Sequence, residues 1–264
     1  MSHISCPKVS VITPAYNAEN LISRTIESVI DQTFSDWEMI VVDDCSSDST
    51  SKVVEAWARK DSRIQLKTLN KNFGGPAGPR NIGVQAARGD YIAFLDADDI
   101  WHPRKLEVQI KVAFQCESDF VCSKMKDFSS EDEVAFSDVA SYNLDKISFF
   151  QQSFRARIPT SSVLVRKELV TLHPFREEIA YKAVEDYHCW LRILDEKSSC
   201  IKIGVPLLFY RKVEGQISGS KLYMMRKVFM VHREYPGRSS AKAVFFTFSH
   251  VVGAVYSRLI KKGM

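Results

Sequence analysis

The chain has 264 residues, 45% of them hydrophobic, which is enough for one large core or for one domain with an appendage. Its 6 cysteines include no Cys-x-x-Cys pair, which argues against zinc and thioredoxin-type sites, and their scatter favours a reducing compartment. The net charge of +4 hides an asymmetry, because residues 211–264 carry 11 Lys and Arg against 2 Asp and Glu, whereas residues 1–210 carry 25 against 30. The N-terminus has no apolar signal core, so we expect a cytoplasmic protein.

Apolar runs alternate with amphipathic segments over the first 115 residues. The pattern predicts strands at 8–13, 37–42, 64–68 and 91–95, and helices at 21–30, 50–60, 79–88 and 102–115. Strands that alternate with helices of about ten residues are typical of βαβ units. We therefore expect an α/β fold built around a mostly parallel sheet.

Each of the four predicted strands is followed by a polar cluster. The clusters are Pro14-Ala15-Tyr16-Asn17, Asp43-Asp44, Asn72-Phe73-Gly74-Gly75 and Asp96-Ala97-Asp98-Asp99. In an open α/β sheet the carboxyl ends of the strands share one edge, and ligands bind there. The four clusters together therefore predict a single binding site.

The fourth cluster places carboxylates directly after the apolar strand 91–95. Carboxylates in such a place need a cation, a ligand or open solvent. Asp96 and Asp98, spaced Asp-x-Asp, suit a hard divalent cation, which in turn suits a phosphate. A solvated acidic turn would explain an isolated cluster, but the three other clusters favour a ligand site. We expect Asp99 to cap the following helix.

The other polar residues each allow two interpretations. Asp43 and Asp44 exceed what a helix cap needs, so one of them can accept hydrogen bonds from a base or a ribose. Tyr16 is either a stacking platform for a base or a core aromatic. Arg80 lies in the first turn of a predicted helix, where the helix dipole disfavours a cation, which indicates a ligand or a carboxylate partner rather than a solvated side chain. The acidic pair that ends in Asp186 is either an acidic helix start or a catalytic group.

The chain resembles the inverting glycosyltransferases of family 2, which have the GT-A fold, in two long runs: VSVITPAYNAENLISRTIESVIDQTFSDWEMIVVDDCSSDST and NFGGPAGPRNIGVQAARGDYIAFLDADDIW. Shorter pieces at 158–169, 184–194 and 206–218 extend the resemblance to about residues 8–218. It implies a Rossmann-like, mostly parallel sheet flanked by helices. The implied catalytic domain covers 1–218, with a nucleotide-sugar half at 1–115 and an acceptor-side half at 116–218, and a basic, amphipathic helical tail follows at 219–264.

The resemblance also implies an activity. The expected enzyme transfers a sugar from a nucleotide sugar, most simply a UDP-sugar, to a hydroxyl of a glycan or a polyprenyl-linked acceptor, using Mg²⁺ or Mn²⁺, in cell-surface polysaccharide biosynthesis. The alternative is a non-catalytic subunit of a polysaccharide assembly complex that binds nucleotide or glycan. A lost Asp-x-Asp motif or a lost acidic base would mark that class, and this sequence keeps both. A sugar-phosphate nucleotidyltransferase would need a Gly-rich loop after the first strand, where this chain has Pro14-Ala15-Tyr16-Asn17.

The resemblance assigns roles to individual residues. It makes Asp186 the catalytic base and Asp98 the metal ligand. The residues it assigns to the nucleotide sugar are Pro14, Tyr16, Asp44, Asn72, Arg80, Asp96, Arg211 and Ser218. Among these, Asp44 would lie nearest the base, and Arg211 and Ser218 would close over the diphosphate from a mobile loop. This loop has Val213-Glu214 where the family often has a His.

The tail contains an apolar segment at 243–256 with Lys and Arg on both sides. As a helix it would span about 21 Å, which is short of the roughly 30 Å hydrocarbon core of a bilayer. Its aromatic and basic residues suit the interface of the inner membrane leaflet, so we expect peripheral binding at the cytoplasmic face. The alternative is a helix docked on the catalytic domain. The apolar character of the segment argues against a nucleic-acid partner.

Overall fold

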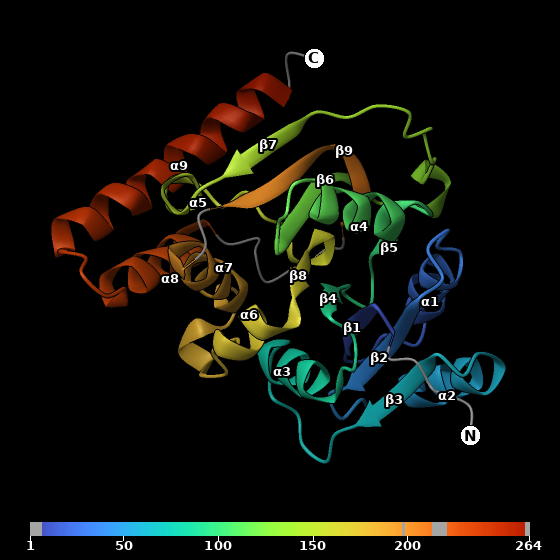
Figure 1. Ribbon diagram of the computed structural model, residues 1–264. Helices are drawn as coiled ribbons and strands as arrows, with labels where there is room; N and C mark the ends of the chain where they lie inside the picture. Colours follow the sequence, from blue (N-terminus) through green and yellow to red (C-terminus); the bar gives the residue numbers. More distant parts are fainter. Residues whose placement is uncertain (1–6, 197–198, 213–220, 262–264) are drawn as a thin grey trace.

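The computed structural model describes residues 7–196, 199–212 and 221–261. Its centre is a nine-stranded sheet in the order β3-β2-β1-β4-β8-β6-β9-β5, with β7 paired to β9. Helices cover the sheet, and the two C-terminal helices lie at one side of the molecule (Figure 1).

The N-terminal half follows the predicted βαβ pattern. Its elements are β1 (Val9–Ala15), α1 (Ile22–Ile30), β2 (Trp37–Asp43), α2 (Thr50–Lys60), β3 (Ile64–Thr68), α3 (Ala77–Ala86) and β4 (Tyr91–Phe94). The strands β3, β2, β1 and β4 are parallel neighbours, and Val9 of β1 lies in register with Trp37 and Tyr91. The predicted elements and their parallel arrangement are confirmed here.

One prediction near the acidic cluster is wrong. The chain continues from Asp99 into a short strand, β5 (Ile100–Trp101), and the next helix, α4 (Lys105–Gln115), begins three residues later than the predicted 102. Trp101 is held in the strand by antiparallel pairing with Leu208 and by the hydrogen bond from its indole Nε1 to the Ser161 carbonyl at 2.7 Å. Asp99 is therefore not a helix cap.

The second half of the sheet is mixed. Its elements are β6 (Phe120–Phe128), η1 (Glu131–Glu133), β7 (Leu144–Ile147), α5 (Phe149–Phe154), η2 (Thr160–Ser162), β8 (Leu164–Arg166), α6 (Lys167–Leu172), η3 (Ile179–Tyr181), α7 (Glu185–Glu196) and β9 (Cys200–Arg211). Strand β8 runs antiparallel to both β4 and β6, whereas β9 is parallel to β6 and antiparallel to β5 and β7.

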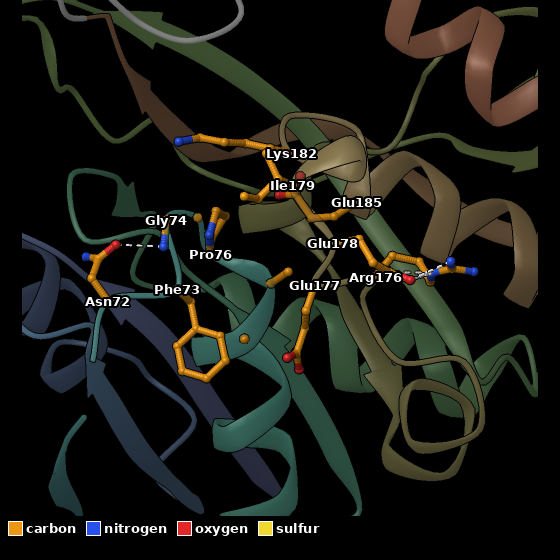
Figure 2. A pocket seen from close by; sticks show the side chains of 13 residues that line it. Asn72, Phe73, Gly74, Pro76, Arg176, Glu177, Glu178, Ile179, Lys182 and Glu185 are labelled. Carbon is orange, nitrogen blue, oxygen red and sulfur yellow. Dashed lines mark hydrogen bonds and ion pairs between the residues drawn. The ribbon is translucent and has the colours of Figure 1, made fainter. Parts of the chain in front are cut away.

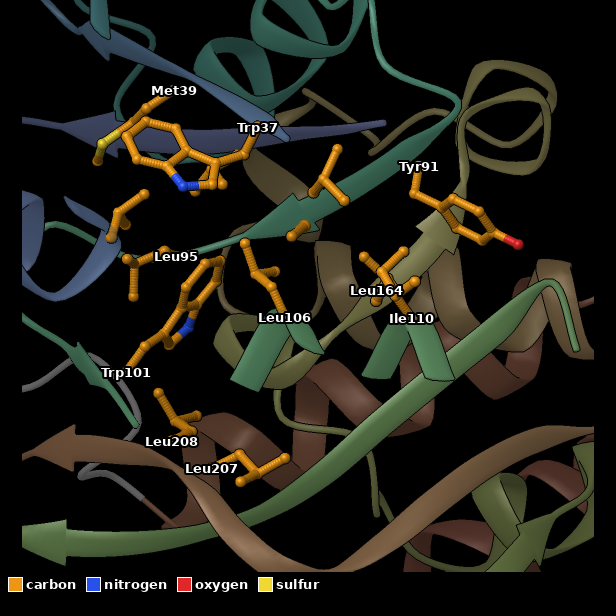
Figure 3. Close-up of a cluster of buried hydrophobic side chains, with 14 of the residues drawn as sticks. Trp37, Met39, Tyr91, Leu95, Trp101, Leu106, Ile110, Leu164, Leu207 and Leu208 are labelled. Carbon is orange, nitrogen blue, oxygen red and sulfur yellow. The ribbon is translucent and has the colours of Figure 1, made fainter. Parts of the chain in front are cut away.

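Two apolar cores lie on opposite faces of the sheet, because successive side chains of a strand alternate between its faces. In β2, Met39 and Val41 join the core that contains side chains of α1, α2 and α4, whereas Ile40 and Val42 join the core that contains side chains of α3, α6 and α7. Figure 3 shows part of the first core, with Trp37 and Trp101 inside it. Between these two cores, the carboxyl ends of the parallel strands β1, β2, β3 and β4 lie at one edge of the sheet.

The tail consists of α8 (Lys221–Glu234) and α9 (Ser240–Lys261), which pack against each other, and α9 also packs on α5. The hydroxyl of Tyr187 in α7 lies 3.0 Å from Nε2 of His232 in α8 and 3.0 Å from Nε2 of His250 in α9. One side of the tail is therefore docked on the rest of the protein through α5 and α7. Within the described residues, no helix has the length and apolar character needed to cross a bilayer.

Candidate active site

The polar clusters that follow β1, β2 and β3 are joined by hydrogen bonds. The Asp44 N–H donates to the Ala15 carbonyl at 2.8 Å, and the Asn72 side-chain amide donates to the Asp44 carbonyl at 2.8 Å. The Phe73 N–H donates to both carboxylate oxygens of Asp44, at 2.9 and 3.1 Å. The three clusters therefore share one edge of the sheet, as topology predicts.

The two adjacent aspartates after β2 have different surroundings. Hydroxyl groups of Ser46 and Ser51 donate to the Asp43 carboxylate, which stabilises the turn into α2. Among the residues that the structure describes, no hydroxyl group donates to the Asp44 carboxylate, which instead accepts the Phe73 N–H. Burial, together with the charge of Asp43, raises the pKa of Asp44 above its ordinary value, against the opposing effect of the Phe73 N–H. Asp44 is thus the carboxylate of this pair that is better placed to meet a ligand.

The chain at the end of β1 exposes an aromatic ring against which a planar group can stack. Tyr16 is 54% exposed, so the interpretation as a core aromatic is wrong. Pro14 is buried within β1, in register with Val42. Asn17 and Cys45, two residues after β1 and β2 end, have φ values of +50° and +61°, which non-glycine residues adopt uncommonly.

Arg80 connects the acidic cluster to helix α7. Its Nη2 lies 2.7 Å from Oδ1 of Asp96, and its Nη1 lies 3.1 Å from Oε1 of Glu185. The side chain is buried, so the carboxylate partner expected from the dipole argument is confirmed and the solvated alternative is wrong. Burial disfavours the charge of Arg80, but the carboxylates of Asp96, Glu185 and Asp186 outweigh burial and raise its pKa above the ordinary value.

Two aspartates of the acidic cluster, Asp98 and Asp99, have raised pKa values. Burial, and then the charge of Asp96, raises the pKa of Asp98 to about 6. Asp99 is fully buried, and its Oδ1 accepts the Arg211 backbone N–H at 3.0 Å. Burial raises the pKa of Asp99 well above its ordinary value, and the charges of Asp98 and Asp96 add to this effect.

Arg211 does not lie where the resemblance places it. It is the last residue of β9 and is buried, so it is part of the sheet and not of a mobile loop. Its Nε donates to the Asp98 carbonyl at 2.9 Å, and its Nη2 lies 3.2 Å from Oε1 of Glu131. Pairing with Phe128 of β6 and these contacts hold Arg211 against the backbone of the acidic cluster. Ser218, the other residue expected in that loop, lies outside the described residues.

Asp186 lies in the first turn of α7 and is partly exposed. Its Oδ2 accepts the Thr160 hydroxyl at 2.7 Å, and its Oδ1 accepts the Tyr187 N–H at 2.6 Å. These two hydrogen bonds fix the orientation of the Asp186 carboxylate at the start of the helix. Ala183, just before the helix, has a φ of +73°, which sets the direction in which the chain enters it.

Glu185, the neighbour of Asp186, has a separate environment. Burial and the charge of Asp186 raise the pKa of Glu185 to about 7, although Arg80 opposes this shift. Its Oε2 is buried and has no hydrogen-bond partner among the described residues. The two carboxylates at the start of α7 are therefore not equivalent, because Glu185 anchors Arg80 whereas Asp186 faces a more open environment.

The pKa of Tyr210 is affected by carboxylates of both the acidic cluster and helix α7. Burial raises its pKa above the ordinary value, and the charges of Asp99, Asp96, Asp98 and Asp186 raise it further. These carboxylates come from two regions about ninety residues apart in the sequence. Contacts join the two regions as well, because Arg80 pairs with both Asp96 and Glu185, and the adjacent residues Ser161 and Thr160 contact the Asp96 N–H and Asp186.

A cavity of about 300 Å³ adjoins this site. It lies between the loop 72–78, which follows β3, and the segment 176–182, with Glu185 in its wall. Figure 2 shows Asn72 and Gly74 on one side and Ile179 and Lys182 on the other. The cavity thus connects the side of Asp44 and Asn72 with the start of α7.

Several contributing residues were not singled out from the sequence. Thr160 and Ser161 in η2 contact Asp186 and the Asp96 N–H, respectively. Glu185 pairs with Arg80 and Glu131 pairs with Arg211. Thr160, Ser161 and Glu185 lie in the pieces 158–169 and 184–194, which resemble the family. That resemblance was the signal in the sequence that could have identified these three residues.

The acidic cluster suits a divalent cation held by few protein ligands. Within the described ranges, no group of three or more His, Cys, Asp or Glu side chains is placed to hold a metal. Asp96 and Asp98 offer only oxygen ligands, which suit a hard divalent cation. Burial, and then the charge of Asp96, raises the pKa of Asp98 to about 6, and a bound cation would oppose both effects. Mg²⁺ is commonly bound by one or two carboxylates, with substrate phosphates as further ligands. The residues present fit such a site.

Comparison with known proteins places this site in a family. The model of "Glycosyl transferase family 2" matches residues 10–167. Over 92% of both chains, the sequence is 35% identical to the UDP-Glc:alpha-D-GlcNAc-diphosphoundecaprenol beta-1,3-glucosyltransferase WfgD of Escherichia coli. It is 32% identical to the putative teichuronic acid biosynthesis glycosyltransferase TuaG of Bacillus subtilis, over 96% of this chain and 98% of that protein.

Solved structures show the same fold. S. aureus TarS 1–349 in complex with UDP-GlcNAc superimposes with a TM-score of 0.70 at 24% identity, over 89% of this chain and 69% of TarS. The mannosyltransferase PcManGT from Pyrobaculum calidifontis, in complex with GDP-Man and Mn²⁺, has a TM-score of 0.66 at 17% identity, over 92% of this chain and 69% of the mannosyltransferase. The expected GT-A fold is confirmed by these likenesses together with the family match.

Proposed function

Because the chain belongs to glycosyl transferase family 2 and is a glycosyltransferase, we propose that it transfers a hexose from a UDP-sugar to a hydroxyl of a lipid-linked saccharide, with inversion at the anomeric carbon. The observation that carries the proposal is that the acidic cluster and Asp186 lie at one site. Arg80 pairs with both Asp96 and Glu185, and the adjacent residues Thr160 and Ser161 contact Asp186 and the Asp96 N–H. The names of two relatives, which specify a diphosphoundecaprenol-linked acceptor and teichuronic acid biosynthesis, support an acceptor in cell-surface polysaccharide assembly.

The nucleotide is proposed to bind at the ends of β1, β2 and β3. The exposed ring of Tyr16 offers a stacking face for the base, and the Asp44 carboxylate can accept a hydrogen bond from the N–H of a uracil. Asn72 supports Asp44 from the next loop. Pro14, buried in β1, shapes the floor of this pocket.

The diphosphate is proposed to lie over the acidic cluster. Asp98 would ligate a Mg²⁺ or Mn²⁺ ion, and Asp96 would lie on the ribose side. When bound, the cation neutralises charge that develops on the departing diphosphate. Arg80 fixes the Asp96 carboxylate through its ion pair, so its role is to position that group rather than to touch the nucleotide.

Asp186 is proposed to take the proton of the acceptor hydroxyl. Its hydrogen bonds from the Thr160 hydroxyl and the Tyr187 N–H hold the carboxylate in a fixed orientation at the start of α7, as a general base requires. Attack by the activated oxygen from the face opposite the diphosphate gives inversion. General-base help of this kind is worth on the order of 10²–10⁴-fold in rate.

We further propose that the enzyme binds peripherally at the cytoplasmic face of a membrane, where a lipid-linked acceptor is available. The excess of Lys and Arg over residues 211–264 supports this location, since the cytoplasmic leaflet is anionic. A non-catalytic binding subunit is the less favoured alternative, because the chain retains both the Asp-x-Asp motif and Asp186.

The proposed function is tested by measuring UDP release from a panel of UDP-sugars, with Mn²⁺ or with EDTA. We expect release from one or a few donors, dependent on the cation and increased by a saccharide-diphospholipid acceptor. The anomeric configuration of the product, determined by NMR, should be opposite to that of the donor. Retention of configuration, or release unaffected by EDTA, would contradict the mechanism.

A further inference from the structure

Helix α9 buries one side and leaves a second apolar side exposed. Ala243, Phe246 and Ser249 face the protein. Val244, Phe248 and Val252 are exposed and recur every four residues, so they form one line along the helix. Phe248 is 66% exposed, which is unusual for a phenylalanine that has a docked helix to bury it.

The short helix α5 extends this exposed side. Phe150 is 60% exposed, and Phe154 is also exposed. The Phe154 ring lies 6.2 Å from the ring of Phe245, which is exposed too, and the Phe150 ring lies 6.0 Å from that of Phe246. We call the combined surface the aromatic face. Its members are Phe150, Phe154, Val244, Phe245, Phe248 and Val252.

The surroundings of the aromatic face are positively charged. The segment 146–157, which contains α5, has no Asp or Glu, and neither does helix α9. Lys242 and Arg157 are exposed beside it in the sequence, and Arg155 follows Phe154 directly. Grouped apolar side chains with a basic border are the composition of surfaces that bind the headgroup region of an anionic bilayer.

The face is firmly attached to the catalytic domain. The Ser249 hydroxyl donates to the Phe154 carbonyl at 2.7 Å, and Nε2 of His250 lies 3.0 Å from the Ser153 carbonyl. His250 also contacts the hydroxyl of Tyr187, the residue that follows Asp186 in α7. A surface bound through this face would therefore have a defined orientation relative to helix α7.

We propose that the aromatic face is a membrane-docking surface that inserts its phenylalanine rings at the interface of an anionic bilayer. This inference specifies the contact by which the proposed peripheral association occurs, and it rests on that association rather than on the donor chemistry. A second copy of the chain fits less well, because a symmetric contact would bring the like charges of two basic borders together. An anionic lipid surface can bury the apolar side chains of the aromatic face and attract the Lys and Arg side chains at its border.

The test is flotation of the full-length protein with vesicles of phosphatidylcholine, with or without about a quarter phosphatidylglycerol. We expect the wild type to float with the anionic vesicles and, because the face is basic, to float much less with the neutral ones. The variant Phe150→Ser/Phe248→Ser removes one ring from each helix and should lower the partition coefficient at least roughly tenfold. Lys242→Glu keeps every ring and should weaken binding to the anionic vesicles alone.

The matched control is Phe114→Ser/Leu172→Ser, which removes side chains that are 57% and 63% exposed elsewhere on the molecule. It should float like the wild type. A wild type that does not float, equal flotation of all variants, or a dimer that the Phe150→Ser/Phe248→Ser change dissociates without any vesicle binding would overturn the proposal. UDP-sugar hydrolysis without vesicles should be unchanged in that variant. A wild type that floats but hydrolyses no UDP-sugar would refute the proposed function and leave the docking surface standing.

Discussion

At the scale of single residues, Arg80 links the two parts of the site. It is buried between Asp96, the first residue of the acidic cluster after β4, and Glu185, the first residue of the helix that contains the proposed base. A buried ion pair is weak evidence of net stabilisation, since desolvation offsets attraction, but removal of one partner leaves an uncompensated buried charge. The arginine therefore determines both the position of Asp96 and the stability of the region around it.

The variant Arg80→Met should lower the free energy of unfolding by about 3–5 kcal/mol, because Glu185 and Asp96 lose their counter-charge. Urea denaturation measures the change. The double variant Arg80→Met/Glu185→Met should recover part of the loss, since it removes the buried carboxylate as well. Arg59→Met, at a solvent-exposed helix pair, serves as the control and should change stability by less than about 0.5 kcal/mol. Equal effects of the Arg80 and Arg59 variants would contradict the role given to Arg80.

At the scale of elements, helix α3 brings Arg80 to the site because it packs closely on the sheet. A Cβ atom built on Gly83 would lie 2.4 Å from Cγ2 of Ile12 in β1. This close approach requires glycine at that position, and it fixes the depth at which α3 lies on β1. The position of the Arg80 side chain thus depends on a contact about one helical turn away from it.

Gly83→Ala should displace α3 and destabilise the fold by about 1–3 kcal/mol, as overpacking usually does. Thermal unfolding measures the loss, and the companion change Ile12→Ala, which removes the methyl group in question, should make the effect of Gly83→Ala smaller. Gln85→Ala, on the exposed side of the same helix, provides the control and should be neutral or slightly stabilising. A Gly83→Ala protein as stable as the control would show that α3 is less tightly packed than described.

The attachment of the tail should depend on pH. Burial lowers the pKa of His232 to about 3 and that of His250 to about 4, and Arg238 and Arg155 act in the same direction on each. Below the ordinary histidine pKa of about 6.5, the unfolded state takes up protons that the folded state refuses. The stability that neutral histidines confer is therefore complete above about pH 6.5 and is lost as the pH falls toward 4.

Hydrogen exchange of α8 and α9 at pH 7.5 and pH 5 tests this expectation, after correction for the intrinsic pH dependence of exchange. Protection of the tail should decrease at pH 5 more than protection of the central strands β1 and β4. In His250→Gln, which keeps a polar side chain but does not titrate, the decrease should be smaller. Equal loss of protection in the tail and the central strands would argue against a titration local to the tail.

The sequence predicts the regular half of the fold better than the mixed half. Alternating apolar patterns locate β1 to β4 and their helices, because period and turn residues are local signals. The two-residue strand β5 leaves no such pattern, and its pairing with Leu208 depends on a segment about a hundred residues away. The same limit explains Arg211, whose place at the end of β9 follows from strand pairing that the sequence does not display.

The candidate site, like the fold, was predicted in part from the sequence. Sheet topology brings Tyr16, Asp44, Asn72 and Asp96 to one edge, and the dipole argument anticipates a carboxylate partner for Arg80. The sequence could not show that Asp99 is buried and accepts the Arg211 N–H rather than capping a helix, nor that Thr160 contacts Asp186. Both contacts join segments that are far apart in the chain, so only the folded structure reveals them.

At the scale of the whole molecule, three parts have separate tasks. The parallel half presents the proposed nucleotide pocket, the mixed half contributes α7 with Asp186, and α8 and α9 dock on the far side of α7 through Tyr187. Helix α7 thus connects the three parts: Glu185 contacts Arg80 of the proposed donor site, Asp186 is the proposed base, and Tyr187 contacts the helix of the proposed membrane surface. In this arrangement, the acidic cluster is proposed to hold the cation that stabilises the departing diphosphate, whereas Asp186 is proposed to take the proton of the acceptor hydroxyl.

A comparison of Asp186→Asn with the wild type tests that claim most directly, through Mn²⁺-dependent binding of UDP by calorimetry and sugar transfer from the preferred UDP-sugar. The account predicts that Asp186→Asn folds and binds UDP with Mn²⁺ like the wild type but transfers sugar at least roughly 100-fold more slowly, because only the base is lost. Transfer at the wild-type rate by Asp186→Asn would contradict it.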